Sequence, residues 1–220
     1  MRIDVLGVPV DTLDLDGAAD TVAGWVSSGR RGYVCVTGVH GVMEARRSPA
    51  VLAAHRQAGL VVPDGMPLVW CGRALRTPIG RVYGPDLMLR LLERGLDAGW
   101  RHAFYGASPD VLADLEAALT ERFPGLKVAG SLAPPYRALT EAEGRAHAEA
   151  LNAMAADVVW VGLSTPKQEQ WMHRWVPSLE ACAALGVGAA FLFHAGHVRQ
   201  APPAVQRAGL EWAYRLAREP

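Results

Sequence analysis

One carboxylate, Asp64, stands in a setting that suits acid–base chemistry. It follows the apolar run Leu60-Val61-Val62 and lies between Pro63, which stiffens the backbone, and Gly65, which permits a sharp turn. A carboxylate held at the end of a strand can act as a general base, removing the proton of a nucleophilic hydroxyl group. The same residues are also typical of a plain turn in which Asp64 caps the following helix, so the spacing leaves both interpretations open.

Three other segments carry groups that could bind a phosphate or a diphosphate. Gly106 ends an apolar run just before a helix, and backbone N–H groups at such a helix start can hold phosphate. Ser164 and Lys167 flank another helix start, while Arg81 offers the forked donors that suit phosphate oxygens. None of these segments matches the dinucleotide-binding or Walker A pattern. An ordinary turn, a capped helix start with a solvated lysine, and a solvated arginine remain the alternatives.

The sequence predicts neither a metal site nor a disulfide. His194 and His197 are three residues apart, but no third ligand is spaced to complete a zinc site, so we expect no bound metal. The three cysteines are widely spaced, at Cys35, Cys71 and Cys182. Because no C-x-x-C motif is present, we expect three reduced, buried thiols.

The elements that must position these groups alternate along the chain between buried strands and amphipathic helices. Apolar and β-branched runs predict strands over residues 33–37, 60–62, 101–106, 126–130, 157–162 and 183–193. Helical periodicity predicts helices over residues 42–57, 68–75, 86–98, 109–123, 140–155, 168–175 and 204–218. Thr140 and Glu143 have the spacing of a capping box.

This alternation predicts an α/β fold, namely a single Rossmann-like domain over residues 1–220 with a mostly parallel sheet and helices on both faces. Ligands of such sheets bind beyond the carboxyl ends of the strands. We therefore expect the functional side chains to follow the strands, as Asp64, Gly106 and Ser164 do, and as His40 does after the first predicted strand.

Composition narrows the range of partners. The chain has 220 residues, with 22 basic and 22 acidic side chains, so the formal net charge is zero. Without a basic excess to neutralise phosphates, a nucleic-acid partner is not expected. No signal peptide and no apolar run of about 20 residues is present, so we expect a cytoplasmic protein with at most peripheral membrane contact.

Four motifs, taken in order, resemble those of the WecG/TagA/CpsF family of bacterial glycosyltransferases. Residues 61–70 are similar to P-D-G-x-x-x-V-W, and residues 81–88 to R-V-x-G-x-D-L-M. Residues 166–169 match P-x-Q-E, and residues 209–220 resemble G-L-E-W-x-x-R-L-x-x-E-P. The resemblance extends over nearly the whole chain, from about Asp4 onward.

The resemblance implies an inverting glycosyltransferase with a Rossmann-like fold and neither an essential metal nor a cofactor. It implies a UDP-sugar donor, often of the N-acetylmannosamine type, and a polyprenyl-diphosphate-linked sugar acceptor. Such an enzyme serves cell-surface polysaccharide or teichoic-acid-type synthesis at the inner face of the cell membrane. Whether the chain forms a homo-oligomer is left open.

Carried over position by position, the resemblance makes Asp64 the general base. Thr37 would lie near the donor, and Arg81 and Gln168 would contact donor or acceptor. The complete set of expected substrate-binding residues is Thr37, His40, Arg81, Gly106, Ser164, Lys167, Gln168 and Glu169.

The chain departs from the family pattern in three ways. Val39 stands where an asparagine is common, and Leu192 replaces the aspartate of a Phe-Asp-Phe triplet, which predicts altered recognition of the nucleotide. Relatives generally continue beyond the Glu-Pro motif into a basic and aromatic tail suited to membrane surfaces. Since this sequence stops at Pro220, we expect it to lack that tail. A non-catalytic nucleotide-sugar-binding module and a scaffold subunit of a polysaccharide assembly are the alternative functions.

Overall fold

A computed structural model describes residues 1–202, 205–206, 209 and 214. The strands are β1 (Arg2–Val5), β2 (Val8–Asp11), β3 (Gly32–Thr37), β4 (Leu60–Pro63), β5 (Arg101–Gly106), β6 (Lys127–Leu132), β7 (Val158–Gly162) and β8 (Ala183–Gly186). The helices are α1 (Leu15–Ser28), α2 (Val39–Arg47), α3 (Pro49–Gln57), α4 (Met66–Ala74), α5 (Gly84–Ala98), α6 (Pro109–Arg122), α7 (Glu141–Ala153), α8 (Lys167–Trp175) and α9 (Ala190–His194), with a 3-10 turn at Val176–Ser178. Most of the helix predicted over 204–218 lies outside the described residues, which include only 205, 206, 209 and 214 of that range.

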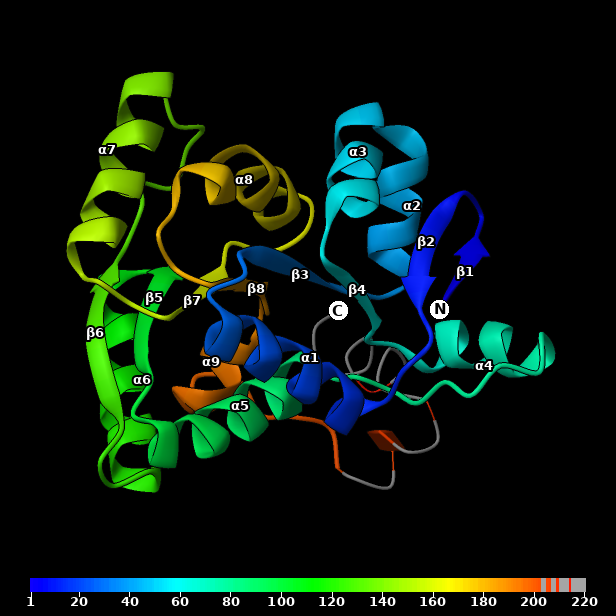
Figure 1. Ribbon diagram of the computed structural model, residues 1–220, viewed down its shortest axis with the longest axis horizontal. Helices are drawn as coiled ribbons and strands as arrows, with labels where there is room; N and C mark the ends of the chain where they lie inside the picture. Colours follow the sequence, from blue (N-terminus) through cyan, green and yellow to red (C-terminus); the bar gives the residue numbers. More distant parts are fainter. Residues whose placement is uncertain (203–204, 207–208, 210–213, 215–220) are drawn as a thin grey trace.

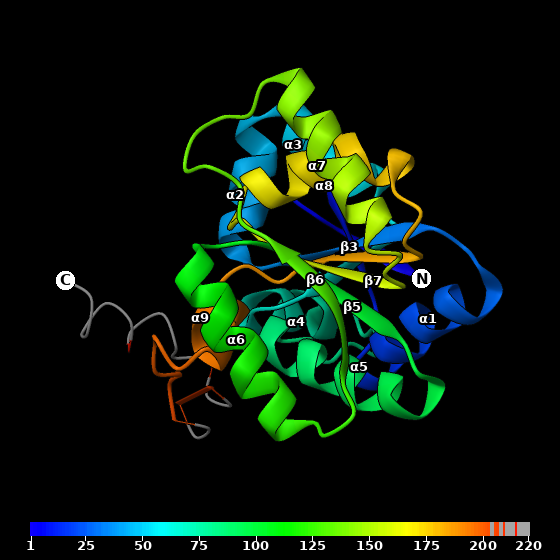
Figure 2. The same ribbon diagram turned by 90° about the vertical axis from the view of Figure 1, so that its left-hand side faces the viewer.

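Six strands form one parallel sheet in the order β4-β3-β8-β7-β5-β6. Helices α2, α3, α7 and α8 cover one face, and α1, α5, α6 and α9 cover the other (Figures 1 and 2). The predicted α/β fold with a mostly parallel sheet is therefore confirmed. Strands buried on both faces need continuous apolar runs, which is why these segments could be recognised.

The two faces of the sheet are buried in two separate apolar clusters because side chains alternate along each strand. In β3, Tyr33 and Cys35 face α3 and α8, whereas Val34 and Val36 pack with α1 and α5. Strand β7 alternates in the same way, and its Trp160 is fully buried on the α5 side. The core thus lies on both sides of the sheet, so the loops at the carboxyl ends of the strands are the places where a ligand can bind.

Most predicted boundaries differ from the structure by one or two residues, and two differ by more. The helix expected over 42–57 is two helices, because Ser48 adopts an extended conformation, caps α3 through its side chain, and is followed by Pro49. The last predicted strand, over 183–193, ends at Gly186. Gly188 then adopts a left-handed φ of 52°, which turns the chain into α9.

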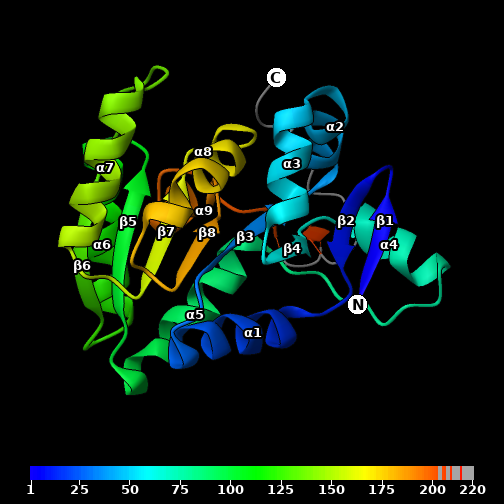
Figure 3. The ribbon, with the colours of Figure 1, turned by 45° about the horizontal axis from the view of Figure 1, so that its top comes forward.

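The N-terminal region contains elements that were not predicted. Strands β1 and β2 form an antiparallel hairpin beside β4, with α4 beyond it (Figure 3). Asp11 ties this hairpin to the main sheet, because its Oδ2 accepts a hydrogen bond from the backbone N–H of Val61 at 2.8 Å. Helix α1 follows, with Asp14 as its N-cap. The capping box at the start of α7, by contrast, was predicted and is confirmed.

A topological switch point lies between β3 and β8. Strand β3 leads into α2 on one face of the sheet, whereas the neighbouring β8 leads into α9 on the opposite face (Figure 2). The two connections diverge beyond the carboxyl ends of these strands, which is where ligands of open parallel sheets bind.

Candidate functional site

Asp64 lies directly after β4, next to the switch point, and is half-buried. Its Oδ1 accepts a hydrogen bond from the backbone N–H of Gly84, the first residue of α5, at 3.2 Å. Its own backbone N–H donates to the carbonyl of Thr37 at 3.0 Å, which joins the end of β4 to the end of β3. The carboxyl group therefore lies at the positive end of α5, a setting that favours a negative charge.

The alternative that Asp64 caps the next helix, α4, is wrong, because its carboxylate caps α5. The N-cap of α4 is Gly65, without a side-chain hydrogen bond, and the carboxylate of Asp64 instead binds the start of α5, some 20 residues later. The other carboxylate oxygen, Oδ2, lies close to Gly38, since a Cβ atom built on Gly38 would be 3.8 Å from it. The carboxylate thus lies between the loop after β3 and the start of α5.

Arg81 is half-buried beside Asp64. Its Nε donates to the backbone carbonyl of Asp64 at 2.7 Å, and its guanidinium lies 4.2 Å from the ring centroid of Tyr83. These contacts place a permanent cation next to the carboxylate residue at the switch point. The alternative of a solvated Arg81 is therefore not what the structure shows.

Thr37, at the end of β3, directs its hydroxyl group into the core and is only 1% exposed. Its Oγ1 lies 3.1 Å from Nε2 of the buried His55, and His55 Nδ1 lies 2.8 Å from the carbonyl of Val51. Because a carbonyl can only accept, His55 Nδ1 donates to Val51, and the single hydroxyl hydrogen of Thr37 lies between His55 Nε2 and the carbonyl of Cys35, which is 3.3 Å from Oγ1. This hydroxyl group therefore holds α3 against β3, while the backbone of Thr37 holds Asp64.

Gly106 and Gly162 close the neighbouring strands β5 and β7, where they lie opposite each other. Gly106 has a φ of 124°, and a Cβ built on it would lie 2.6 Å from the carbonyl carbon of Gly162. Directly beyond them, Ala107 and Ser164 have the positive φ values of 56° and 65° that are uncommon outside glycine. Leu6, Arg76 and Ala155 adopt similar conformations in turns elsewhere, so these values show that the chain turns sharply after β5 and β7.

The remaining candidates for diphosphate binding lie at the rim. His40 is exposed in the first turn of α2, and Ser164 is exposed before α8. The N-cap of α8 is Pro166, without a side-chain hydrogen bond, so the alternative of a helix start capped by a side chain is not what the structure shows. Lys167 is exposed, and its ammonium lies 5.0 Å from the ring centroid of Tyr136 in the loop after β6.

Gln168 and Glu169 are buried, at 3% and 0% exposure. Gln168 Nε2 donates to Glu169 Oε1 at 3.2 Å and to the carbonyl of Gly186 at 3.1 Å. Thr165 Oγ1 also donates to Glu169 Oε1, at 2.9 Å. These four residues join the loop after β7 to the end of β8.

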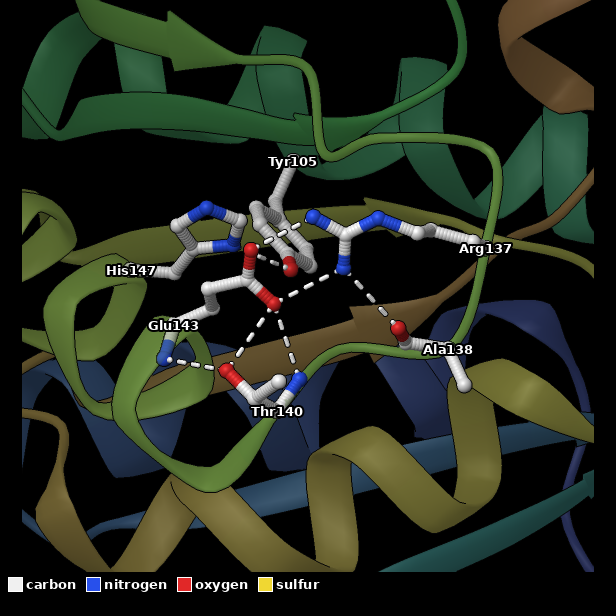
Figure 4. Close-up of polar contacts among 6 residues, drawn as sticks. All are labelled: Tyr105, Arg137, Ala138, Thr140, Glu143 and His147. Atoms are coloured by element: carbon white, nitrogen blue, oxygen red, sulfur yellow. Dashed lines mark hydrogen bonds and ion pairs between the residues drawn. The ribbon is translucent and has the colours of Figure 1, made fainter.

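The loop after β6 is fixed by a polar cluster at the opposite end of the carboxyl edge (Figure 4). Arg137 binds both carboxylate oxygens of Glu143, which also accepts from the backbone of Thr140. These contacts hold the pKa of Glu143 well below its usual range, with the Arg137 hydrogen bonds as the largest cause. Beside them, Tyr105 OH lies 3.0 Å from His147 Nδ1 (Figure 4).

Among the described residues, no group of three histidine, cysteine or acidic side chains could hold a metal ion. His194 Nε2 lies 3.1 Å from the carbonyl of Pro85, and His197 pairs with Asp114, so the two histidines face different partners. The prediction of three buried cysteines is wrong for Cys71, which is exposed, and Cys182 is half-buried.

The structure thus brings Asp64, Arg81, Gln168 and Glu169 to the two sides of the switch point. A Cβ on Gly84 would lie 3.5 Å from the carbonyl of Val187, so the start of α5 joins the Asp64 side to the β8 loop. Ser164 lies beside the turn after β8, since a Cβ built on Gly188 would lie 3.9 Å from Ser164 Cα. Gly106 and Lys167 lie further along the edge, and the Thr37 hydroxyl points away from it.

Four contributors to this edge were missed by sequence reasoning: Gly38, His55, Gly84 and Gly188. Gly84 was visible as part of the R-V-x-G motif, but its N–H acts on a carboxylate some 20 residues earlier. Gly188 lay in the strand region predicted over 183–193, where Gly186 and Gly188 were expected to break the strand, but its role in the turn into α9 was not foreseen. No local pattern pairs His55 with Thr37.

Comparison with known proteins defines the class. A family model described as the glycosyl transferase WecG/TagA/CpsF family matches residues 3–220. An α/β protein that this family model matches over nearly its whole length is a glycosyltransferase. The chain belongs to the WecG/TagA/CpsF family, as the four motifs indicated.

Two relatives show how far the similarity extends. The N-acetylglucosaminyldiphosphoundecaprenol N-acetyl-beta-D-mannosaminyltransferase of Bacillus spizizenii is 32% identical over 178 residues, which cover 80% of this chain and 67% of the relative. The protein of the same name from Staphylococcus aureus is 24% identical over 217 residues, covering 97% of this chain and 84% of the relative.

Proposed function

We propose that this glycosyltransferase moves an N-acetylmannosamine-type or related hexose from a UDP-sugar to a polyprenyl-diphosphate-linked sugar. The names of the two relatives support this acceptor and this type of sugar. The observation that carries the proposal is the position of Asp64, whose carboxylate is oriented by the N–H of Gly84 at the switch point of a parallel sheet. Both substrates would meet beyond the carboxyl ends of β3, β4 and β8.

The proposed reaction is a single displacement. Asp64 takes the proton of the acceptor hydroxyl group as its oxygen forms a bond to the anomeric carbon. The bond between that carbon and the diphosphate oxygen breaks on the opposite side, so UDP leaves and the configuration inverts. The cation of Arg81 would stabilise the negative charge that develops on the diphosphate. The exposed Lys167, Ser164 and His40 would contact the polar ends of the substrates.

Because the acceptor carries a polyprenyl chain, we propose that the protein works at the inner face of the cell membrane, in cell-surface polysaccharide or teichoic-acid-type synthesis. In the part of the chain that the structure describes, no helix is long and apolar enough to cross a membrane. We also propose that transfer needs no metal ion, with Arg81 and helix N-termini supplying the positive charge.

The first test replaces Asp64 with asparagine. The amide oxygen of Asp64→Asn can still accept from the N–H of Gly84, so the fold and the donor site should persist. We expect kcat to fall roughly 10²–10⁴-fold, because the general base is lost, while the Kd for UDP stays within about threefold. The matched control is Asp110→Asn, an exposed carboxylate in the first turn of α6. Wild-type turnover by Asp64→Asn would remove Asp64 from the role of base.

A calorimetric titration with UDP, GDP and ADP tests the donor site, first with chelator and then with magnesium. Selective binding of UDP that ignores magnesium agrees with the proposal. Binding of UDP without any transfer to a lipid-linked acceptor would instead favour a nucleotide-sugar-binding module. That alternative has some support from Leu192, which packs against the apolar core below the sheet where the family commonly has an aspartate.

A further inference from the structure

Helix α4 lies at the margin of the molecule, beyond β1, and one of its faces is open to solvent (Figures 1 and 3). The opposite face packs on β1 and β4, and its buried residues are Leu68, Val69 and Gly72. On the open face, Trp70 is 50% exposed although Gly209 lies against it, and Leu75 at the end of the helix is 61% exposed. Two large apolar side chains exposed on one short helix indicate a surface that binds a partner.

The charged side chains of this helix all have one sign. Between Gly65 and Gly80 the chain has two arginines, Arg73 and Arg76, and neither an aspartate nor a glutamate. Both arginines are exposed, in a protein whose basic and acidic side chains are equal in number. Two cations beside exposed apolar side chains, without an acidic residue in the same segment, are complementary to a negatively charged partner.

The residue types of this face suit the boundary between water and a lipid bilayer. Tryptophan prefers the level of the lipid head groups, because its ring is apolar and its N–H is polar. Arginine can lay its aliphatic stem along an apolar surface while its guanidinium reaches a lipid phosphate. Trp70 and Leu75, flanked by Arg73 and Arg76, therefore have the composition of a helix that lies on an anionic membrane.

The position of α4 relative to Asp64 connects this face with the site. The helix begins at Met66, two residues after Asp64, and Trp70 follows about one turn later. Interfacial helices bury their apolar face about 5–10 Å into the boundary between head groups and acyl chains. A docked α4 would therefore hold Asp64 near the level of the head groups. The diphosphate of a polyprenyl-linked sugar lies at the same level, because its chain lies among the acyl chains.

We propose that the open face of α4, formed by Trp70, Arg73, Leu75 and Arg76, docks onto the anionic surface of a membrane. Trp70 and Leu75 enter the interface, and the two arginines bind lipid phosphates. The docking stands on the exposure and charge of this helix alone. Its use in catalysis rests on the proposed function, since only a lipid-linked acceptor requires Asp64 to lie at the membrane.

A fluorescent label on Cys71 tests the docking, because this thiol is exposed on α4. The Cys182→Ser chain is labelled at Cys71 with a nitrobenzoxadiazole dye, whose emission strengthens and shifts to the blue in an apolar setting. The matched control is the Cys71→Ser chain labelled at Cys182, which directly precedes β8 at the amino end of the sheet. With vesicles of equal parts phosphatidylglycerol and phosphatidylcholine, we expect the blue shift at Cys71 alone.

Two results would overturn the proposal. One is vesicle-bound protein whose Cys71 label does not change its emission. The other is a Cys71 signal that grows with protein concentration in the absence of vesicles, because a second copy of the chain would then cover α4.

Charge reversal tests the role of the arginines by co-sedimentation with the same vesicles. The double variant Arg73→Glu/Arg76→Glu is compared with Arg30→Glu/Arg31→Glu, an exposed pair at the amino end of β3 that changes the net charge equally. We expect vesicle affinity to fall at least about 10-fold for the α4 variant and less than about threefold for the control. Equal losses, or no loss in the α4 variant, would overturn the proposal.

Transfer assays separate this inference from the proposed function. The α4 variant should transfer sugar normally to a short-chain, water-soluble acceptor but more slowly to a polyprenyl-linked acceptor in vesicles, and an equal loss with both acceptors would overturn the link to catalysis. Wild-type protein that docks onto vesicles but transfers to neither acceptor would refute the proposed function and not the docking surface.

Discussion

The polar side chains of the carboxyl edge are held largely by backbone groups. Asp64 Oδ1 is held by the N–H of Gly84, Gln168 Nε2 by the carbonyl of Gly186, and Arg81 Nε by the carbonyl of Asp64. Backbone partners do not change when a side chain is substituted. Isosteric substitutions at this edge therefore test chemistry with little disturbance of the fold.

His102 gives a prediction at the residue level. It is fully buried in β5, and its Nδ1 accepts from Trp160 Nε1 at 3.2 Å, so the ring is neutral. Burial lowers the pKa of His102 from 6.5 to about 4, against a smaller opposing effect of Asp157. Because the pKa of His102 is lower in the folded protein than in the unfolded chain, protonation of this histidine favours unfolding. The free energy of unfolding is therefore unaffected by His102 above pH 6.5 and decreases as the pH falls toward 4.

We expect this histidine to remove about 3 kcal/mol from the free energy of unfolding between pH 6.5 and 4. His102→Gln keeps an acceptor for Trp160 but cannot take up a proton in this range. Urea titrations of both proteins at several pH values measure the difference. An identical pH dependence for wild type and His102→Gln would show that His102 does not cause the loss.

Among the elements, the ends of β5 and β7 depend on the close approach of Gly106 and Gly162. We expect Gly106→Ala to destabilise the protein by at least about 1–3 kcal/mol, since the φ of 124° is strained for alanine and the new Cβ would meet backbone atoms. The matched control is Gly24→Ala in α1, where a Cβ meets nothing within 4 Å. This variant should gain about 0.5–1 kcal/mol. Thermal unfolding of both variants measures these changes. A Gly106→Ala variant as stable as wild type would contradict the close approach of Gly106 to the backbone of Gly162.

The connections between elements also explain where the site forms. Strand β3 is followed on its own side by β4, but the chain then crosses to the far side of the sheet and returns through β7 to β8. The loop after β8 therefore lies beside the loop after β3, although about 150 residues separate them in the sequence. Asp64 and Gln168 reach the same edge for this reason.

At the scale of the whole molecule, the three cysteines provide a probe of folding. Cys71 is exposed on α4, Cys182 is half-buried, and Cys35 is buried in the central strand β3. Burial, with a further contribution from Glu169, raises the pKa of the Cys35 thiol well above its usual range. Thiolate is the reactive form, so Cys35 should be protected in the native state.

We expect a thiol reagent to modify Cys71 rapidly in the native protein, Cys182 more slowly, and Cys35 only upon unfolding. The rate of labelling at each position, followed by peptide mass spectrometry across a urea series, measures this. Cys71→Ser should abolish the rapid phase and leave the other two phases unchanged. Rapid labelling of Cys35 in native protein would contradict the central position of β3.

Local pattern was sufficient for much of the fold. Strands β3, β4 and β7 are buried on both faces, so each is dominated by an apolar run that is visible in the sequence, and β5 shows such a run from Ala103 to Tyr105. The capping box of α7 is equally local, since its two residues are three apart. The exceptions were the short hairpin, helix α1, and the turn at Gly188 that ends β8 early.

The sequence by itself determined the family, the α/β class and the identity of the main candidates, Asp64, Arg81 and Gln168. Motifs and apolar runs are properties of neighbouring residues, so one sequence suffices to find them. Only the tertiary structure decided what each residue faces: Asp64 binds the start of α5, Thr37 turns toward His55, and Glu169 lies behind Gln168. These contacts join residues on different elements, or depend on which side of a helix is buried. They follow from strand order and packing, which no local pattern encodes.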